Sequence, residues 1–182
     1  KILETNTALL DPNAFENEIK KGALILDVRS ADTFEKAHIP NAINIGLNGQ
    51  FAPWVGALID TNKPLVIIAE DNKQTAVALS LARVGYENIK GFLKAGIEAW
   101  EHAENSIQKV VSINPADFVK TVDNKTNILD VRNAGEWDSG IVKNAQLITL
   151  ADLQKGLNTL NKTETYYVYC AGGYRSMMAA SI

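Results

Sequence analysis

Short apolar runs alternate with longer amphipathic stretches along this chain of 182 residues. The runs "ALILDV", "LVIIA", "NILDV" and "YYVYC" have the length and the β-branched or aromatic composition of buried strands. Pro12 and Pro115 stand where the first turn of a helix tolerates proline. Residues 75–86 have helical apolar spacing, with Gly85 as a C-cap, and residues 95–100 indicate a further short helix. This alternation predicts an α/β fold whose parallel β-sheets are flanked by helices.

The same pattern occurs twice. Residues 23–45, "ALILDVRSADTFEKAHIPNAINI", recur at residues 126–148 as "TNILDVRNAGEWDSGIVKNAQLI", an offset of 103 that aligns Asp27 with Asp130. The segments before and after these stretches correspond in the same order. Since chance similarity would not preserve that order, the sequence predicts a duplicated unit.

The repeat defines two expected domains, residues 1–104 and 105–182, with the seam near residues 101–109. The first copy continues well beyond Leu81, through a further strand and helix, whereas the second copy stops at its counterpart, Ile182. We therefore expect the second copy to be C-terminally incomplete, with an open apolar strand edge. On this interpretation the chain is a fragment of a longer protein, or the tail is supplied in another way. The absence of Met at position 1 likewise suggests a processed or excised chain.

Composition narrows the class of protein. A net charge of −3 with 46% hydrophobic and 21% charged residues is ordinary for a globular protein. No apolar run approaches the ~20 residues of a membrane span, and no signal-like segment is present. Mild acidity without basic clusters argues against nucleic acid and membrane as partners. One cysteine cannot form an internal disulfide, so we expect a cytoplasmic location, and one Cys with two distant His predicts no metal site.

The single cysteine has a suggestive position. Cys170 follows a predicted strand and opens the segment "CAGGYR", after which a helix is predicted. Ligands of parallel sheets bind at the carboxyl ends of strands. A free thiol has a pKa of about 8.5, and backbone N–H groups at a helix N-terminus favour its thiolate. Gly172 and Gly173 allow the loop to curl, and Arg175 adds a positive charge that favours both the thiolate and an anionic substrate.

The combination of LDVR, "HIPNA" and C-x-x-G-x-R resembles tandem rhodanese domains over essentially the whole chain. It is especially similar to the rhodanese region of bacterial fusions with a persulfide dioxygenase of the metallo-β-lactamase fold. The resemblance implies an enzyme, a sulfurtransferase that moves a sulfane sulfur from thiosulfate or a low-molecular-weight persulfide to a thiol, sulfite or cyanide. It implies a persulfide on Cys170 and no cofactor. It also implies substrate binding by Ala171, Gly172, Gly173, Tyr174 and Arg175.

Partners and rival functions follow from the same resemblance. The expected partners are a small sulfur donor and a thiol acceptor, with a metallo-β-lactamase-fold dioxygenase domain before this region in the parent protein; its H-x-H-x-D-H motif is absent here. One alternative is a non-catalytic docking or sulfur-carrier module. A third is a phosphatase or arsenate reductase of the same fold. The loop from Cys170 to Arg175 has six residues, one fewer than in the related dual-specificity phosphatases, which favours sulfur.

The first copy lacks the reactive group. Ala69 replaces Cys170, Gln74 replaces Arg175, and the acidic pair at positions 70 and 71 would repel an anion. We therefore expect the first domain to be inactive and to serve a structural or docking role. A cation site at the acidic pair is a less favoured alternative to a solvated loop.

The remaining polar positions have mainly structural interpretations. Asp130 and Arg132 occur in both copies, so we expect them to support the fold, with Arg132 paired to a carboxylate such as Glu136; a catalytic role is the alternative. Arg29 and Glu35 would pair in the same way in the first copy. We expect Tyr174 at the rim of the pocket, Trp137 in the core and His102 on the surface. We expect His38 to cap a turn.

Overall fold

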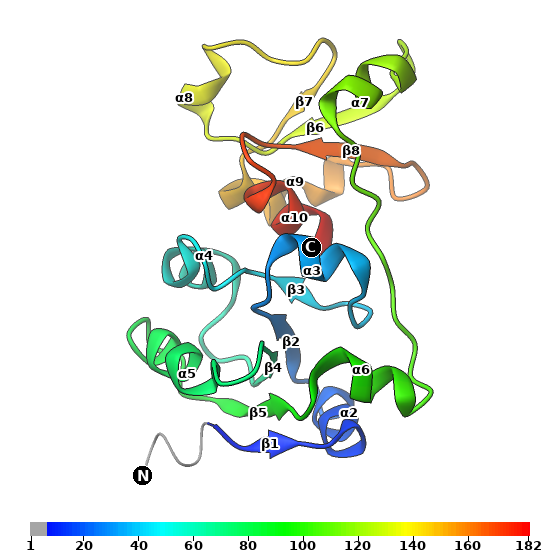
Figure 1. Cartoon of the computed structure of the whole chain (residues 1–182). Coiled ribbons are helices and arrows are strands. Elements are labelled where there is room, and N and C mark those ends of the chain that lie inside the picture. The colour runs from blue at the N-terminus through cyan, green and yellow to red at the C-terminus, as the bar shows by residue number, and fades with distance from the viewer. Residues whose placement is uncertain (1–6) are drawn as a thin grey trace. The chain divides into compact units, whose positions relative to one another are not determined.

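The computed structural model describes residues 7–182, which form two compact units divided between Val110 and Val111. Each unit is a parallel sheet flanked by helices (Figure 1). The division falls beyond residue 104 because the linker pairs with the first unit. Gln108 and His38 exchange backbone hydrogen bonds of 2.8 and 3.0 Å, and the Val110 N–H donates to the carbonyl of Glu35.

The first unit contains a five-stranded sheet in the order β1-β5-β4-β2-β3, in which every pair is parallel. Its centre is β4, whose side chains are fully buried, because both faces of the sheet are covered. The strands are β1 (Leu9–Leu10), β2 (Leu24–Asp27), β3 (Ile43–Asn44), β4 (Leu65–Ile68) and β5 (Ile89–Leu93).

Helices α4 and α5 cover one face of this sheet, and α2 and α6 cover the other (Figure 1). The Asp11 carboxylate accepts a hydrogen bond from the Ala14 N–H at the start of α2, and Pro12 occupies the first helical position, as predicted. Gly85 has the predicted left-handed conformation, with φ 86°, although α5 already ends at Ala82. The helices are α2 (Pro12–Lys20), α3 (Ala31–Lys36), α4 (Phe51–Leu58), α5 (Gln74–Ala82) and α6 (Gly96–His102).

The second unit repeats the central part of the first. Its sheet has the order β7-β6-β8, and Asp130 pairs with Tyr169 as Asp27 pairs with Ile68. Strand β8 lies at the edge of this sheet, next to β6 alone. The elements are α7 (Pro115–Thr121), β6 (Asn127–Asp130), α8 (Ala134–Trp137), β7 (Gln146–Leu147), η1 (Leu150–Asp152), α9 (Leu153–Gly156), η2 (Leu157–Thr159), β8 (Tyr166–Tyr169) and α10 (Tyr174–Ser181).

The segment before α7 shows how the two copies differ. In the first unit, β1 precedes the proline-initiated helix and pairs with β5. Residues 111–114 precede α7 without forming a strand. Within residues 111–182 this stretch has no counterpart of β5 to pair with.

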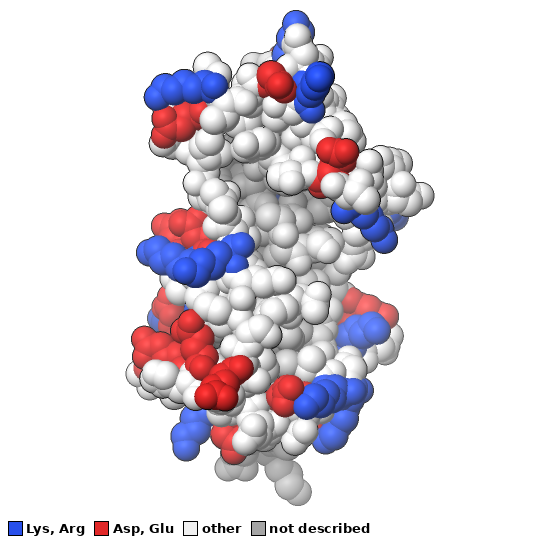
Figure 2. All heavy atoms as spheres, turned by 90° about the vertical axis from the view of Figure 1, so that its right-hand side faces the viewer, with Lys and Arg blue, Asp and Glu red and all other residues white. Residues whose placement is uncertain are grey.

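None of the helices within residues 7–182 combines the length and apolar character that a membrane span requires. Figure 2 shows a face on which Lys and Arg side chains lie beside Asp and Glu side chains in both units. A nucleic-acid-binding surface gathers basic side chains over one area. The face in this view is instead mixed in charge.

Candidate active site

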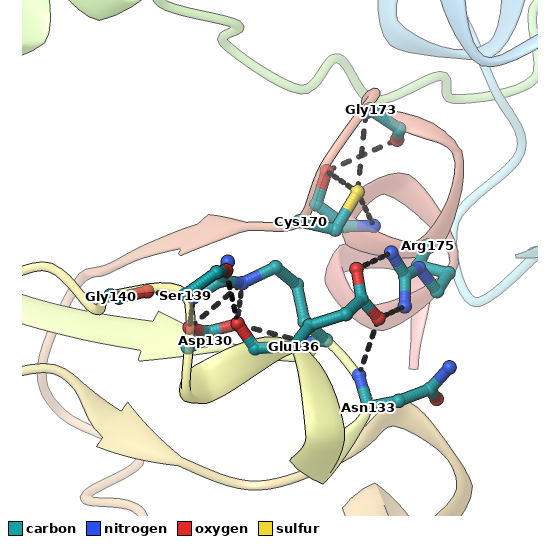
Figure 3. A network of polar contacts seen from close by, with 10 residues as sticks. Asp130, Asn133, Glu136, Ser139, Gly140, Cys170, Gly173 and Arg175 are labelled. Carbon is teal, nitrogen blue, oxygen red and sulfur yellow. Dashed lines mark hydrogen bonds and ion pairs between the residues drawn. The ribbon is translucent and has the colours of Figure 1, made fainter.

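Cys170 lies where the sequence pattern places it, directly after β8 and before α10 (Figure 3). The loop of residues 171–173 is exposed, while Cys170 is partly buried at its base. Gly173 adopts the left-handed conformation, with φ 87°, immediately before α10 begins. A side chain at that φ would be strained, so this glycine allows the sharp change from strand to helix.

Three groups surround the Cys170 sulfur. The N–H of Gly173 donates to Sγ at 3.2 Å, and the N–H of Ser176 donates at 3.3 Å. The Ser176 Oγ lies 3.5 Å from Sγ, where it accepts from the thiol and donates to the thiolate. Burial raises the pKa of the thiol, but hydrogen bonds from Ser176, Gly172 and Gly173 outweigh burial and lower it. The first turn of α10 is therefore built to hold a thiolate.

Arg175 turns toward helix α8 rather than standing free beside the thiol. Its two terminal nitrogens donate to the two carboxylate oxygens of Glu136, at 2.5 and 2.8 Å (Figure 3). Glu136 also accepts from the Asn133 N–H in a capping box at the start of α8. Arg175 lowers the pKa of Glu136 to about 2, so this carboxylate is charged at neutral pH. The pair is bidentate, the geometry that Arg and a carboxylate favour.

Arg132 does not pair with Glu136, contrary to the expectation from sequence. It binds Asp130 with both Nε and Nη2, and Nη2 also donates to the Gly140 carbonyl at 2.7 Å. The Tyr169 hydroxyl donates to Asp130 Oδ2 at 2.5 Å and accepts from the Val142 N–H. Burial opposes the ionisation of Asp130, but Arg132 and Tyr169 outweigh it and lower its pKa. These contacts tie together the ends of β6 and β8, which is a supporting role.

The first unit has the same support without the thiol. Arg29 binds Asp27 through Nε and Nη2 and donates to the Ala37 carbonyl. The prediction that Arg29 pairs with Glu35 is therefore wrong. Ile68 stands in place of Tyr169, and Ala69 follows it where Cys170 follows Tyr169. The acidic residues that come next are exposed.

The other predicted side chains are placed as follows. Tyr174 begins α10 half-buried, and burial raises its pKa to about 12. Trp137 is only partly buried, and its indole N–H lacks a hydrogen-bond partner within the described residues. His38 is buried, its Nδ1 lies 3.0 Å from the Phe34 carbonyl, and it stacks on the Phe34 ring. His102 is exposed, as expected.

Sequence reasoning missed two contributors to the site. The sequence patterns do not single out Ser176, although it lies within one helical turn of the loop. They pair Glu136 with Arg132, whereas its partner is Arg175. A comparison of the two copies could have predicted the pairing of Glu136 with Arg175. In the first copy Thr33 replaces Glu136 and Gln74 replaces Arg175. The carboxylate and the arginine are thus absent together.

A family model for the rhodanese-like domain matches residues 11–103 and 114–182. The chain therefore belongs to the rhodanese-like family, with two copies of the domain. Both matched segments contain the LDVR motif, and the second contains Cys170 and its loop.

Individual relatives extend the comparison. A thiosulfate sulfurtransferase, GlpE, of Pseudomonas savastanoi is 32% identical over 82 residues, which cover 44% of this chain and 74% of the relative. YrkF of Bacillus subtilis, named as a proposed sulfur carrier, is 32% identical over 96 residues, 52% of this chain and 50% of YrkF. The chain thus spans about half the length of YrkF.

Among solved structures, the chain is similar to a thiosulfate sulfurtransferase from Pseudomonas aeruginosa, with 18% identity and a TM-score of 0.47. That match covers 98% of this chain and 41% of the other. These comparisons concern rhodanese-type domains, and the association with a metallo-β-lactamase-fold domain stays a prediction from the sequence.

Proposed function

We propose that this chain is a sulfurtransferase in which Cys170 carries the sulfur, while the first unit is a non-catalytic partner domain. The observation that carries the proposal is the sulfur of Cys170, held by the N–H groups of Gly173 and Ser176 at the base of an exposed loop. The lowered pKa of this thiol makes the nucleophilic thiolate more abundant at neutral pH. The named activity of the relative GlpE supports the same reaction class.

The reaction has two displacement steps. The Cys170 thiolate attacks the outer sulfur of thiosulfate; a bond forms between Sγ and that sulfur, the sulfur–sulfur bond of the donor breaks, and sulfite leaves with the electron pair. With a low-molecular-weight persulfide as donor, a thiolate leaves instead. An acceptor thiolate, sulfite or cyanide then attacks the outer sulfur of the Cys170 persulfide, and Cys170 leaves as a thiolate. No electrons are gained or lost overall, so neither step requires an oxidant.

The hydrogen bonds at the loop serve both steps. The N–H groups of Gly173 and Ser176 stabilise Cys170 when it is the attacking thiolate and again when it is the leaving group. Residues 171–173 are exposed, and the space beside Gly172 and Gly173 is open, which supports the approach of a donor to the loop. The first unit contains Ala69 at this position and cannot form a persulfide there.

Intact-mass spectrometry tests the proposal. The protein and its Cys170→Ser variant are incubated separately with thiosulfate and with glutathione persulfide. We expect the mass of one additional sulfur on the unmodified protein alone, and its loss after addition of cyanide or a thiol. If a folded sample gains no sulfur from either donor, the proposal is wrong.

A sulfur-carrier role is the second candidate, and the name of the relative YrkF favours it. It uses the same Cys170 persulfide but delivers the sulfur to a protein. Rapid discharge of the persulfide by small thiols, sulfite or cyanide supports the enzyme. A persulfide that persists in excess small acceptor supports the carrier.

A further inference from the structure

The two arginines near Cys170 are both neutralised. Arg132 is bound to Asp130, which is fully buried, and Arg175 is bound through both terminal nitrogens to Glu136. The loop residues between Cys170 and Arg175 carry no charge. The thiolate is held mainly by N–H and hydroxyl dipoles, and Arg175 still interacts with Cys170 although Glu136 is its stronger partner. The ionised site has a net negative charge once these two ion pairs are counted.

This arrangement disfavours a doubly charged donor. Thiosulfate carries two negative charges and would approach a thiolate beside an arginine whose charge is already balanced by Glu136. A donor with one negative charge suffers less repulsion. Because Arg175 is only 16% and Glu136 only 33% exposed, solvent screens this ion pair incompletely.

A comparison of the two units distinguishes the Glu136–Arg175 ion pair from the Asp–Arg ion pair. The Asp–Arg pair at the end of the central strand occurs in both units. The other ion pair, between Glu136 and Arg175, is replaced by Thr33 and Gln74 in the unit without a thiol. In the second unit Glu136 binds both the Asn133 N–H of the capping box and Arg175, so loss of the carboxylate charge has to be tested with the cap retained. Glu136 thus occurs in the unit that contains the thiol and is replaced in the unit that lacks it.

We propose that Glu136 is a specificity-determining residue, which by neutralising Arg175 makes the site select sulfur donors with one negative charge over thiosulfate. The proposal rests on the proposed function, since it concerns the donor for the Cys170 persulfide. Donors of the preferred class include alkyl persulfides and thiosulfonates. With methanethiosulfonate, the Cys170 thiolate attacks the outer sulfur, the bond between the two donor sulfurs breaks, and methanesulfinate leaves with the electron pair.

Methanethiosulfonate and thiosulfate are a matched pair of probes, because each has an outer sulfur on an oxidised sulfur but they differ by one charge. The experiment measures kcat/KM for both donors with cyanide as acceptor, in the unmodified protein, Glu136→Gln and Asp138→Asn. Glutamine can still accept the Asn133 N–H, so α8 keeps its capping box. Asp138 is an exposed carboxylate of the same segment, and its variant controls for a general loss of negative charge.

We expect Glu136→Gln to raise kcat/KM for thiosulfate relative to methanethiosulfonate by about tenfold. Added salt should reduce this gain, since it arises from an uncompensated charge. Asp138→Asn should leave the ratio unchanged within about twofold.

An unchanged ratio in Glu136→Gln, with both donors slowed alike, would mean that Glu136 only holds the fold and would overturn the inference. Failure of both donors to load Cys170 in the unmodified protein is a different result. It would overturn the proposed function itself.

Discussion

The Ser176 hydroxyl provides the sharpest test of how the thiol is activated. Its Oγ lies 3.5 Å from the Cys170 sulfur, while the two N–H donors lie at 3.2 and 3.3 Å. Ser176→Ala removes the hydroxyl and leaves both N–H groups in place. The variant therefore isolates the contribution of the hydroxyl to the lowered pKa of the thiol from the contributions of the backbone N–H groups.

The size of the effect follows from the geometry. A hydrogen bond to a charged group contributes about 1.5–3 kcal/mol, and the long distance and partial exposure place this one near the lower limit. About 1.4 kcal/mol corresponds to one pKa unit. We therefore expect Ser176→Ala to raise the pKa of Cys170 toward its ordinary value.

The assay is the rate of alkylation by iodoacetamide as a function of pH, followed by intact mass. Only the thiolate reacts, so the midpoint of the rate profile reports the pKa of Cys170. Ser176→Thr retains a hydroxyl and should restore the midpoint. Ser181→Ala removes a hydroxyl that bonds the Met178 carbonyl at the far end of the helix, and should change nothing. A midpoint in Ser176→Ala equal to that of the unmodified protein would refute the reasoning, because the N–H groups alone would then account for the thiolate.

Three further predictions test the surroundings of the site. Tyr169→Phe removes the 2.5 Å hydrogen bond to Asp130 and should destabilise the second unit by about 1–2 kcal/mol in urea unfolding; an unshifted transition would mean that the contact is energetically neutral. Ala69→Cys, introduced together with Cys170→Ser, should gain no sulfur by intact mass, because the new thiol follows β4 into an acidic loop; sulfur uptake there would contradict our view of the first unit. The pKa of Glu136 is about 2 in the folded protein against an ordinary 4.5, so its ion pair stabilises the fold above pH 4.5 and this contribution is lost as the pH falls toward 2. Thermal unfolding between those pH values should therefore depend less on pH in Glu136→Gln than in the unmodified protein.

The strands and the duplication could be predicted from the sequence because both leave local traces. A strand buried on both faces requires a run such as "LVIIA", and that run forms β4. Pro12 and Pro115 mark helix starts because proline is favoured at the first helical position, and α2 and α7 begin at these residues. The position of Cys170 between strand and helix follows from the same local patterns.

The partner of Arg132 could not be predicted in this way. Asp130 lies two residues before it and Glu136 four residues after it, so sequence distance does not decide between them. The backbone decides, because the Arg132 side chain folds back onto the carboxylate at the end of β6. Glu136 is meanwhile held by Asn133 and by Arg175, which is 39 residues away.

The contribution of Ser176 was also hidden. The residue is one of two serines that follow Cys170 in the sequence, and no sequence pattern distinguishes it from Ser181. Its hydroxyl lies near the sulfur only because Gly173 turns the chain so that α10 begins under the thiol. A backbone conformation, rather than a motif, creates the contact.

The contacts of the loop differ greatly in sequence separation, and this has a consequence for partly folded states. The donors to the Cys170 sulfur lie three and six residues away, whereas the carboxylate that binds Arg175 lies 39 residues away. Contacts between near neighbours close small loops and survive local opening better than distant ones. If α8 detaches from α10, the thiol should therefore remain activated, while the selection among donors by charge that we propose for Glu136 should be lost. Reactivity and selectivity would then decline at different points along an unfolding curve.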